Sequence, residues 1–518
     1  MGMCDGIEHN EMFSLPTVSL ASGFRVRACT YSFFAVLIIV IAVYYLFLLS
    51  NGTLQIIAPE AMDKVFNSML EHLLRGEFTV DREVIGFEAF TRDGETYAYF
   101  GVFPALLRLL AMPFTDIAQA SLARLSCVTA VVVFVILQLR MLLIVHDSLP
   151  AGSRMPAYLA VMVAATILSG PQLYILGSAA IYHEAILWSA ALAAAFNLVV
   201  LRAAFGGGLR TRDLATLAAL AGLALITRPS IGAALYLGTV LLVGWLAWRR
   251  HGADRRERPL NLSAALGDAS VALPFAILGL MAAVAGTINF ARWGNPFVFA
   301  DFNDYFWFQQ HPEFIAVLHN YGEFNLGRIW IGALYYATGI PYFLKTVQPF
   351  AGFLASRVAG VEAPPFTPLL TNPLTVLLAA IGIYRLWWKP DLTGERLAIL
   401  RLALVGNALA VFLVFAAMML VMRYRFDFAP FMTLASLVGY RSVAIAAAGA
   451  GPQRCRQLRI IVAGLCIVGI LGSHYVLLVH KVWSFAVPIE VRLALFPFAP
   501  FARPAFQPGS GIAGPPAR

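Results

Sequence analysis

Carboxylates that could act as a general base are concentrated between Asn51 and Phe103. Nine of the 28 Asp and Glu residues fall there, in about a tenth of a sequence that is otherwise poor in charge. Apolar periodicity predicts an amphipathic helix over Ala61–Arg75, with Asp63 in its first turn. We predict that Asp63 is the catalytic carboxylate and that Glu60 is the second choice. Most of the other acids in the stretch are expected to be simply solvated.

Four further polar groups interrupt the apolar runs: Tyr182-His183-Glu184, Thr227-Arg228-Pro229, Asn289-Phe290-Ala291-Arg292 and Arg423-Tyr424-Arg425-Phe426-Asp427. Charged groups at membrane depth are costly and usually face a cavity or a partner. Their clustering on one side therefore predicts a polar binding site formed by His183, Glu184, Arg228, Arg292, Arg423, Arg425 and Asp427. A simpler reading makes Arg292 a surface anchor, Glu184 part of a helix start, and Arg425 the ion-pair partner of Asp427.

The elements that must position these residues are membrane helices. The sequence is 60% hydrophobic and 13% charged with a mean hydropathy of +0.76, which leaves too little polar surface for a soluble protein of 518 residues. We predict an all-α polytopic fold, because apolar runs of about 20 residues recur along the chain. The expected helices lie near residues 30–50, 121–145, 157–177, 184–203, 213–227, 229–248, 268–289, 370–387, 397–421, 428–446 and 459–480.

Basic residues set the predicted orientation. With the N-terminus in the cytoplasm, every short cytoplasmic loop carries Arg or Lys, as the positive-inside rule requires. This divides the chain into a cytoplasmic tail (1–27), a single membrane domain (28–487) with external loops at about 51–120 and 290–368, and a Pro-rich external tail (488–518). Within the second loop, Leu326–Phe343 is expected to be a helix on the membrane surface, with Arg328 at its start.

Other chemistries lack their motifs. Gly206-Gly207-Gly208 has no following Lys-Ser/Thr and so does not form a phosphate-binding loop, and no serine-hydrolase elbow occurs. His311 and His319 are a weak pair for zinc, so we predict no metal site and no cofactor, although a need for a divalent cation stays open. None of the five cysteines falls in an external loop, and no structural disulfide is expected. The net charge of +9 is explained by orientation, not by nucleic acid.

The order of these features resembles the GT-C superfamily of polytopic glycosyltransferases. The likeness rests on the acidic first loop, a Tyr-rich Gly-Val-Phe-Pro segment, the Thr-Arg-Pro hairpin, and the Asn-Phe-Ala-Arg-Trp-Gly-Asn-Pro and Arg-Tyr-Arg-Phe-Asp exits, over roughly residues 30 to 445. It is to bacterial members near the lipid A aminoarabinose transferases and protein O-mannosyltransferases. Many relatives carry two adjacent acids at the start of the first loop, whereas here Ala61-Met62 separate Glu60 from Asp63.

The resemblance implies transfer of a hexose or pentose from a polyprenyl-phosphate carrier to a periplasmic glycolipid, glycan or protein. The protein would lie in the bacterial inner membrane with its active side toward the periplasm. A first-loop carboxylate, Asp63 or Glu60, would act at the reacting centre. Arg228 is the first choice for binding the leaving phosphate, with Arg423 and Arg425 across the site, Asp427 orienting one of the arginines, and Arg292 or Arg328 in reserve.

Two other functions compete with this interpretation. A transporter or flippase for a lipid-linked or anionic solute would favour charged residues in mid-span and paired broken helices, neither of which the sequence shows. An O-antigen polymerase or ligase also uses external loops with arginines, but such proteins more often carry their main loop late in the chain. The sequence does not specify the sugar or the acceptor.

Overall fold

The computed structural model describes residues 20–251, 267–362 and 367–484, with side chains from residue 35 onward. The predicted external tail, residues 1–19 of the predicted cytoplasmic tail, most of the basic loop after Arg249 and the side chains of Arg25 and Arg27 lie outside the described residues. The described chain is an all-α polytopic membrane protein. Eight of its helices are long and apolar enough to cross a membrane, and Ala35–Leu49 and Pro373–Trp387 are shorter apolar helices.

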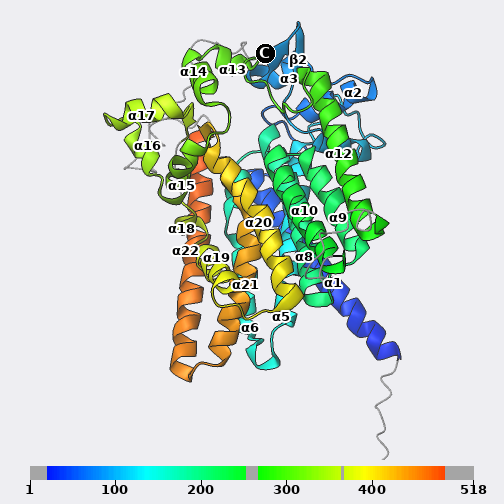
Figure 1. The fold of residues 1–518 in the computed structure, drawn as a ribbon, viewed down its shortest axis with the longest axis vertical. Helices are drawn as coiled ribbons and strands as arrows, with labels where there is room; N and C mark the ends of the chain where they lie inside the picture. Colours follow the sequence, from blue (N-terminus) through cyan, green and yellow to red (C-terminus); the bar gives the residue numbers. More distant parts are fainter. Residues whose placement is uncertain (1–19, 252–266, 363–366, 485–518) are drawn as a thin grey trace, which may run out of the picture.

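The long helices pack side by side in one bundle (Figure 1). A helix occurs at each of the eleven predicted positions, while the number that cross the membrane stays a prediction. Helix α8 lies at the centre of the bundle, against α5, α9 and α20. The bounds are α1 Leu20–Leu49, α5 Ala123–Asp147, α6 Pro156–Leu168, α7 Pro171–Ile175, α8 Ile181–Gly206, α9 Thr211–Leu225, α10 Pro229–His251, α12 Ala269–Trp293, α19 Pro373–Trp387, α20 Gly394–Ala416, α21 Ala429–Ala448 and α22 Pro452–Ser484.

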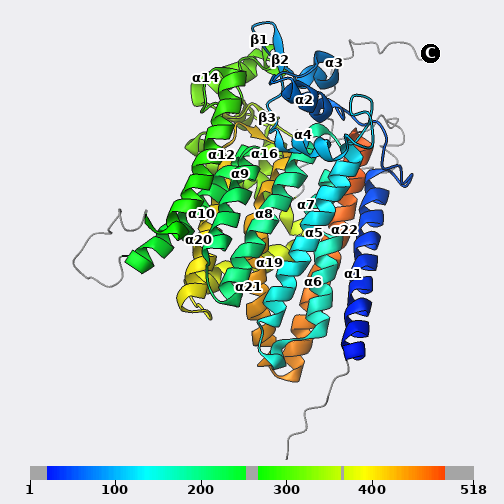
Figure 2. The same cartoon turned by 90° about the vertical axis from the view of Figure 1, so that its right-hand side faces the viewer.

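The two long connections gather at one end of the bundle, which we call the loop face (Figures 1 and 2). The first contains α2 Val65–Leu74, α3 Arg82–Ile85, η1 Gly86–Glu88, β1 Phe90–Arg92, β2 Glu95–Tyr97, α4 Phe103–Leu107 and η2 Arg108–Leu110. The second contains α13 Phe306–Gln309, α14 Pro312–Tyr321, η4 Leu326–Arg328, α15 Ile329–Thr338, α16 Ile340–Leu344, α17 Phe350–Arg357, β3 Gly360–Val361 and α18 Pro368–Thr371.

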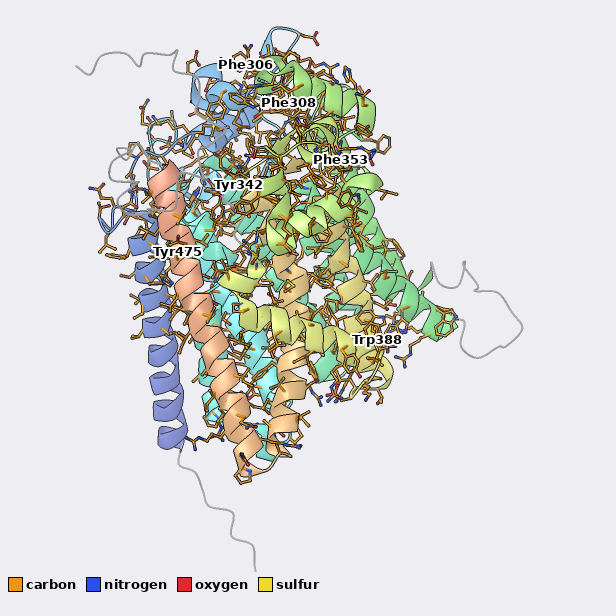
Figure 3. All side chains as sticks on the ribbon, turned by 90° about the vertical axis from the view of Figure 1, so that its left-hand side faces the viewer. Phe306, Phe308, Tyr342, Phe353, Trp388 and Tyr475 are labelled. Carbon is orange, nitrogen blue, oxygen red and sulfur yellow. The ribbon has the colours of Figure 1, made fainter. Side chains whose placement is uncertain are left out.

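The two connections form one layer because they share an aromatic core. The ring of Phe90 stacks on Tyr305 at 4.7 Å and meets Trp293 edge-on at 5.4 Å. Main-chain hydrogen bonds join the same segments, from Thr91 to Asp304 and from Phe306 to Ala89. Aromatic side chains also mark both ends of the bundle, with Tyr342 and Phe353 near the loop face and Trp388 toward the other end (Figure 3).

Four predicted helices differ from the structure, namely the one observed as α20 and three others. The first-loop helix begins at Val65, not at Ala61, because the preceding residues form a turn in which Met62 has a positive φ. The third predicted membrane helix is broken into α6 and α7 where Gly170 adopts a φ of 113° before Pro171. The predicted surface helix Leu326–Phe343 is likewise interrupted, by Gly339 at a φ of 74°.

The segment after α20 has the largest consequence for the site. The prediction extended this helix to residue 421, but it ends at Ala416. The chain then forms a short strand, β4 Met419–Leu420, that pairs in parallel with β3, followed by the 3₁₀ helix η5 Met422–Phe428. This irregular connection, held at the loop face by β3, carries two of the predicted arginines and Asp427.

Candidate active site

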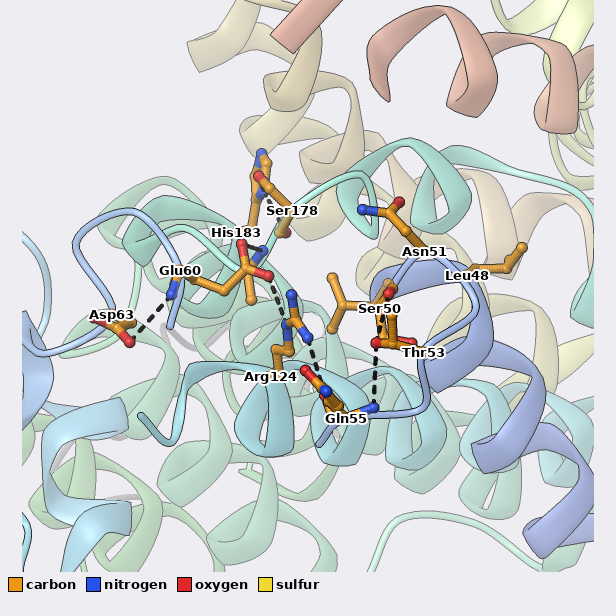
Figure 4. Close-up of polar contacts among 12 residues, drawn as sticks. Leu48, Ser50, Asn51, Thr53, Gln55, Glu60, Asp63, Arg124, Ser178 and His183 are labelled. Carbon is orange, nitrogen blue, oxygen red and sulfur yellow. Dashed lines mark hydrogen bonds and ion pairs between the residues drawn. The ribbon is translucent and has the colours of Figure 1, made fainter. Parts of the chain in front are cut away.

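The predicted catalytic carboxylates lie in the turn before α2. The Oδ2 atom of Asp63 accepts a hydrogen bond from the backbone N–H of Glu60 at 3.2 Å (Figure 4). Among the described residues, no cation lies within ion-pair distance of Asp63. Its carboxylate is buried at 9% exposure, and this one backbone donor leaves it capacity to accept another proton donor.

Glu60 is held differently. Its Oε1 atom pairs with Nε of Arg124 at 2.6 Å, and its Oε2 atom accepts from the backbone N–H of Ala179 at 3.4 Å. Arg124 also donates to the carbonyl of Gln55 (Figure 4). The available signal for Arg124 in the sequence was an arginine at the external end of a predicted span, against the positive-inside rule. Because its charge is balanced by Arg124, Glu60 is a weaker base candidate than Asp63.

Helix α2 fixes the position of this turn. Its apolar face, formed by Val65, Phe66, Met69 and Leu70, is buried in the core of the first connection. That core continues into the segment around Gly101, where the backbone N–H of Phe103 donates to the carbonyl of Ile226 at 3.1 Å. A Cβ atom on Gly101 would lie 2.2 Å from the same carbonyl oxygen, so only glycine permits this close approach. The first connection is thereby held against the turn that carries Arg228.

Arg228 forms the central ion pair of the loop face. Its Nε lies 2.7 and 3.0 Å from the two carboxylate oxygens of Asp427 in η5, and Ser230 donates to Oδ2 of Asp427 at 2.8 Å. The guanidinium lies over the ring of Tyr424 at 5.0 Å. The side chain of Arg228 remains 17% exposed whereas that of Asp427 is 1% exposed. The acid therefore orients an arginine that can still reach a ligand.

Arg423 lies beside this pair, between aromatic rings and a carboxylate. Its guanidinium is 4.2 Å from the ring centre of Tyr182 and 5.8 Å from that of Tyr424. Its Nη1 atom is 3.9 Å from Oε1 of Glu362, a long ion pair at the end of the second connection. We call Arg228, Arg423, Asp427, Tyr182, Tyr424, Glu362 and Glu88 the arginine cluster.

The sequence interpretation missed both carboxyl groups that flank Arg423. Glu88 from the first connection is 8% exposed and accepts a hydrogen bond from the hydroxyl of Tyr305 at 2.9 Å. Burial raises the pKa of Glu88, and Arg423 acts against this shift. Burial also raises the pKa of Glu362, opposed by Arg423 and by the backbone N–H of Met422. Glu88 is a buried carboxyl with a raised pKa and is therefore a candidate for proton transfer, whereas the side chain of Glu362 is 32% exposed.

The start of α8 lies between the carboxylates and the arginine cluster. Ala179 contacts Glu60, and Tyr182 contacts Arg423. His183 is 3% exposed, with Nδ1 2.8 Å from the carbonyl of Ser178 and its ring edge-on to that of His480 at 6.2 Å. No hydrogen bond or ion pair joins Asp63 or Glu60 directly to the cluster within the described residues.

Glu184 belongs to the scaffold. Its two oxygens accept from Nη1 and Nη2 of Arg108 at 2.7 and 2.9 Å, and the hydroxyl of Ser126 adds a third bond at 2.5 Å. Nε of Arg108 donates to Asn67 on α2. This buried network joins α2, η2, α5 and α8, and it occupies the oxygens that a substrate would need. The sequence interpretation did not predict Arg108 as the partner of Glu184, and substrate binding by Glu184 stays a prediction.

Arg292 and Arg328 both donate hydrogen bonds to backbone carbonyls of the protein. Arg292 is 3% exposed, donates from Nη1 to the carbonyl of Phe100 at 2.9 Å and contacts the sulfur of Met69 through Nη2. Arg328 is 1% exposed and donates to the carbonyls of Arg357, Gly322 and Glu323. Arg292 is therefore not the exposed surface anchor that the simpler reading describes. Arg292 ties the first connection to the end of α12, and Arg328 joins separate parts of the second connection.

Arg425 faces a different region from Arg423. Its Nη2 atom donates to Oγ1 of Thr371 at 2.9 Å, and Nη1 contacts the sulfur of Met422. Asp427 pairs with Arg228, so the proposed mutual pair of Arg425 with Asp427 is not formed. Among the described residues, no group of three or more His, Cys, Asp or Glu side chains is arranged to hold a metal ion.

The fold and site define a multi-pass helical membrane protein. Beneath the layer formed by its two long connections, Arg228 forms an ion pair with the buried Asp427, and Arg423 lies beside this pair. No family model and no curated protein matches the sequence. Among solved structures, the Archaeoglobus fulgidus oligosaccharyltransferase AglB, in complex with an inhibitory peptide and a dolichol-phosphate, is 14% identical with a TM-score of 0.47 over 88% of this chain and 56% of that chain. An apo form of the Archaeoglobus fulgidus oligosaccharyltransferase is 13% identical with a TM-score of 0.46 over 86% and 55%.

The chain thus spans little more than half the length of those structures. Similarity at this level assigns neither a family nor an activity to the chain. The functional argument therefore rests on the residues of the site.

Proposed function

We propose that this protein is a membrane glycosyltransferase of the GT-C type that moves a sugar from a polyprenyl-phosphate carrier to an acceptor hydroxyl or amide. The observation that carries the proposal is the ion pair of Arg228 with Asp427 beside Arg423, where membrane helices end beneath the loop layer. Two guanidinium groups at that depth suit a lipid-borne phosphate, because guanidinium stays charged and binds phosphate bidentately. A lipid-linked donor also fits a chain without a nucleotide-binding motif.

The proposed step breaks one bond and forms one bond at the anomeric carbon of the sugar. For a hydroxyl acceptor, the bond between the anomeric carbon and the phosphate oxygen breaks, and a new bond forms from that carbon to the acceptor oxygen. The acceptor proton passes to Asp63, whose carboxylate accepts one backbone hydrogen bond from within the described part of the chain. The lipid phosphate leaves with the bond electrons, and Arg228 and Arg423 stabilise its growing negative charge.

The remaining residues take supporting roles in this proposal. Arg124 holds Glu60 in place beside Asp63, and Tyr182 and His183 lie where the start of α8 approaches both groups. Glu184 and Arg292 are assigned to the scaffold, because both oxygens of Glu184 already bind Arg108 and Nη1 of Arg292 already donates to the carbonyl of Phe100. We further propose a bacterial inner-membrane location with the loop face toward the periplasm, and a glycolipid, glycan or protein as acceptor.

The test uses purified full-length protein in lipid nanodiscs with a panel of synthetic polyprenyl-phosphate hexoses and pentoses, and an envelope extract as the source of acceptor. We expect radiolabelled sugar to leave the carrier and appear in extract material, with release of free polyprenyl phosphate. A flippase would instead move an intact carrier-linked sugar across the bilayer of sealed vesicles without breaking the sugar–phosphate bond. If the protein moves the intact carrier-linked sugar across the bilayer and transfers no sugar, it is a flippase and the proposal is wrong.

A further inference from the structure

Large apolar side chains are exposed on three short helices of the second connection, α15, α16 and α17. We call this segment, residues 329–357, the arm. Trp330 of α15 is 56% exposed and Phe343 of α16 is 59% exposed, and Phe350 and Phe353 of α17 are exposed too. The rings of Trp330 and Phe353 lie 5.7 Å apart, so α15 and α17 share one apolar surface. A contiguous exposed apolar surface marks a place of contact with a partner or a membrane.

Both ends of the arm are fixed at the loop-face end of the bundle. Helix α15 packs against α20, and a Cβ atom on Gly332 would lie 2.4 Å from the carbonyl oxygen of Phe415, one residue before α20 ends. Directly after the arm, the backbone N–H of Ala359 donates to the carbonyl of Met418 at 2.8 Å. Between these attachments α16 and α17 extend sideways beyond the bundle (Figure 1). Because the bundle crosses a membrane, an element that extends sideways at the ends of its helices lies over the surrounding lipid.

Charge divides the second connection into two parts. Residues 295–323, before the arm, hold four acids and no lysine or arginine. Residues 324–361 hold Arg328, Lys345 and Arg357 and no Asp or Glu. Arg328 is buried against backbone carbonyls, whereas Lys345 and Arg357 are half-buried on the arm. The apolar surface is therefore accompanied by positive charge alone, which favours an anionic partner.

Lys345 and Arg357 both lie over aromatic rings. The Nζ atom of Lys345 is 4.0 Å from the ring centre of Tyr342 and makes one long contact, at 3.5 Å, with the carbonyl of Val361. The guanidinium of Arg357 is 5.0 Å from the ring centre of Tyr321. Within the described part of the chain, neither cation forms an ion pair with a carboxylate. Cations beside exposed aromatic and apolar side chains are typical of elements that lie in a membrane interface.

We propose that the arm binds the surface of the bilayer, with its exposed aromatic rings at the level of the lipid headgroups and Lys345 and Arg357 beside anionic headgroups. Aromatic side chains favour this layer, and anionic lipids attract nearby lysine and arginine. The confinement of the acids to the part before the arm favours a lipid surface over a protein partner. The inference extends the expected surface helix, which ended at Phe343, to α17 and the two cations. It needs only a membrane protein and does not depend on the proposed sugar transfer.

Electron paramagnetic resonance of spin-labelled, full-length protein in nanodiscs wide enough for two copies tests where the arm lies. The labels are attached to Val347→Cys and Phe350→Cys in a cysteine-free background, with Glu95→Cys as the control in water and Val468→Cys as the control on the exposed face of α22. We expect both arm labels to collide with oxygen more than with the neutral nickel complex NiEDDA, as Val468→Cys should, whereas Glu95→Cys should show the reverse. NiEDDA access equal to that of Glu95→Cys would place the arm in water and overturn the proposal. Spectral broadening that disappears on dilution with unlabelled protein would show that a second copy covers the arm, and would overturn it too.

The composition of the bilayer tests the role of the two cations. Phosphatidylglycerol added to a phosphatidylcholine bilayer should lower NiEDDA access at Val347→Cys by about twofold or more, and high salt should abolish this effect by screening. The effect should disappear in Lys345→Gln/Arg357→Gln and persist in the matched control Arg385→Gln/Lys389→Gln, which removes two cations at the other end of the bundle. Thermal unfolding checks that both double variants are folded. An undiminished effect in folded Lys345→Gln/Arg357→Gln, or no effect of phosphatidylglycerol in the parent protein, would contradict the proposal.

Discussion

Arg228 and Asp427 are 199 positions apart in the sequence, yet the Nε atom of the arginine lies 2.7 and 3.0 Å from the two carboxylate oxygens. The pair joins the turn between α9 and α10 to η5, and the first connection packs on the same turn through Phe103. The turn that carries Arg228, the 3₁₀ helix that carries Arg423 and Asp427, and the segment of the first connection around Phe103 therefore meet at or next to this contact. It fixes one cation where a membrane-borne phosphate would arrive.

Replacing Arg228 tests this role. Arg228→Ala should lower turnover of a polyprenyl-phosphate sugar by about 10²–10³, because the cation acts mainly on charge that develops in the transition state. Arg228→Lys should recover only part of that loss, since lysine does not form the bidentate contact. Transfer assays on purified variants measure the effect, with thermal unfolding recorded alongside. Wild-type turnover in both variants would make Arg228 a structural residue only.

The assignment of the base predicts a contrast within the first connection. Asp63→Asn should reduce turnover by about 10²–10⁴ while donor binding stays close to wild type, because a positioned base contributes in that range. Glu71→Gln on α2 is the control and should have little effect. Single-turnover kinetics with preloaded donor would separate binding from chemistry. Equal losses in the two variants would indicate damage to the connection.

The Arg108–Glu184 network predicts a loss of stability. Both side chains are almost fully buried, at 3% and 1% exposure, so Glu184→Gln leaves a buried guanidinium without its counter-charge. Removing one partner of such a pair costs about 3–5 kcal/mol. Thermal unfolding in detergent should show a large decrease for Glu184→Gln, partly reversed by adding Arg108→Met. If Glu184→Gln unfolds like wild type but no longer binds the donor, the residue belongs to the substrate site.

Glu323 predicts a pH dependence of stability. Burial, together with the nearby Asp301, raises the pKa of Glu323 to about 7. The folded protein then binds more protons at this residue than the unfolded chain does, so its contribution to stability falls as pH rises from about 4.5 to about 7 and is constant above that. Glu323→Gln should therefore gain stability relative to wild type as pH increases over this window. Unfolding midpoints that shift in parallel for both proteins at pH 5 and pH 8 would refute the assignment.

The orientation is tested by cysteine labelling in a cysteine-free background. Glu95 in the β1–β2 hairpin and Thr393 before α20 are both exposed, and the hairpin and the start of α20 lie toward opposite ends of the bundle (Figure 1). An impermeant thiol reagent applied to intact spheroplasts should modify Glu95→Cys and leave Thr393→Cys unmodified until the membrane is opened. The reverse pattern would place the loop face in the cytoplasm and remove the proposed periplasmic site.

The sequence by itself determined the helical membrane class and the approximate place of each long helix. These properties follow from local hydropathy, and a run of about 20 apolar residues has few alternatives. The broken helix at Gly170 also had a local signal, since the following Pro171 favours a new helix start. The polar groups at the helix ends were visible for the same reason, because charge stands out against apolar sequence.

Only the tertiary structure decided which of those groups meet. Asp427 pairs with Arg228 instead of Arg425, Glu184 is occupied by Arg108, and the buried acid Glu88 comes to the side of Arg423. These pairings depend on how helices distant in sequence pack. They also depend on the 3₁₀ helix η5, which turns Arg423 toward Tyr182 and Arg425 toward Thr371. Hydropathy carries no information about either, because it records the depth of a residue and not its partner.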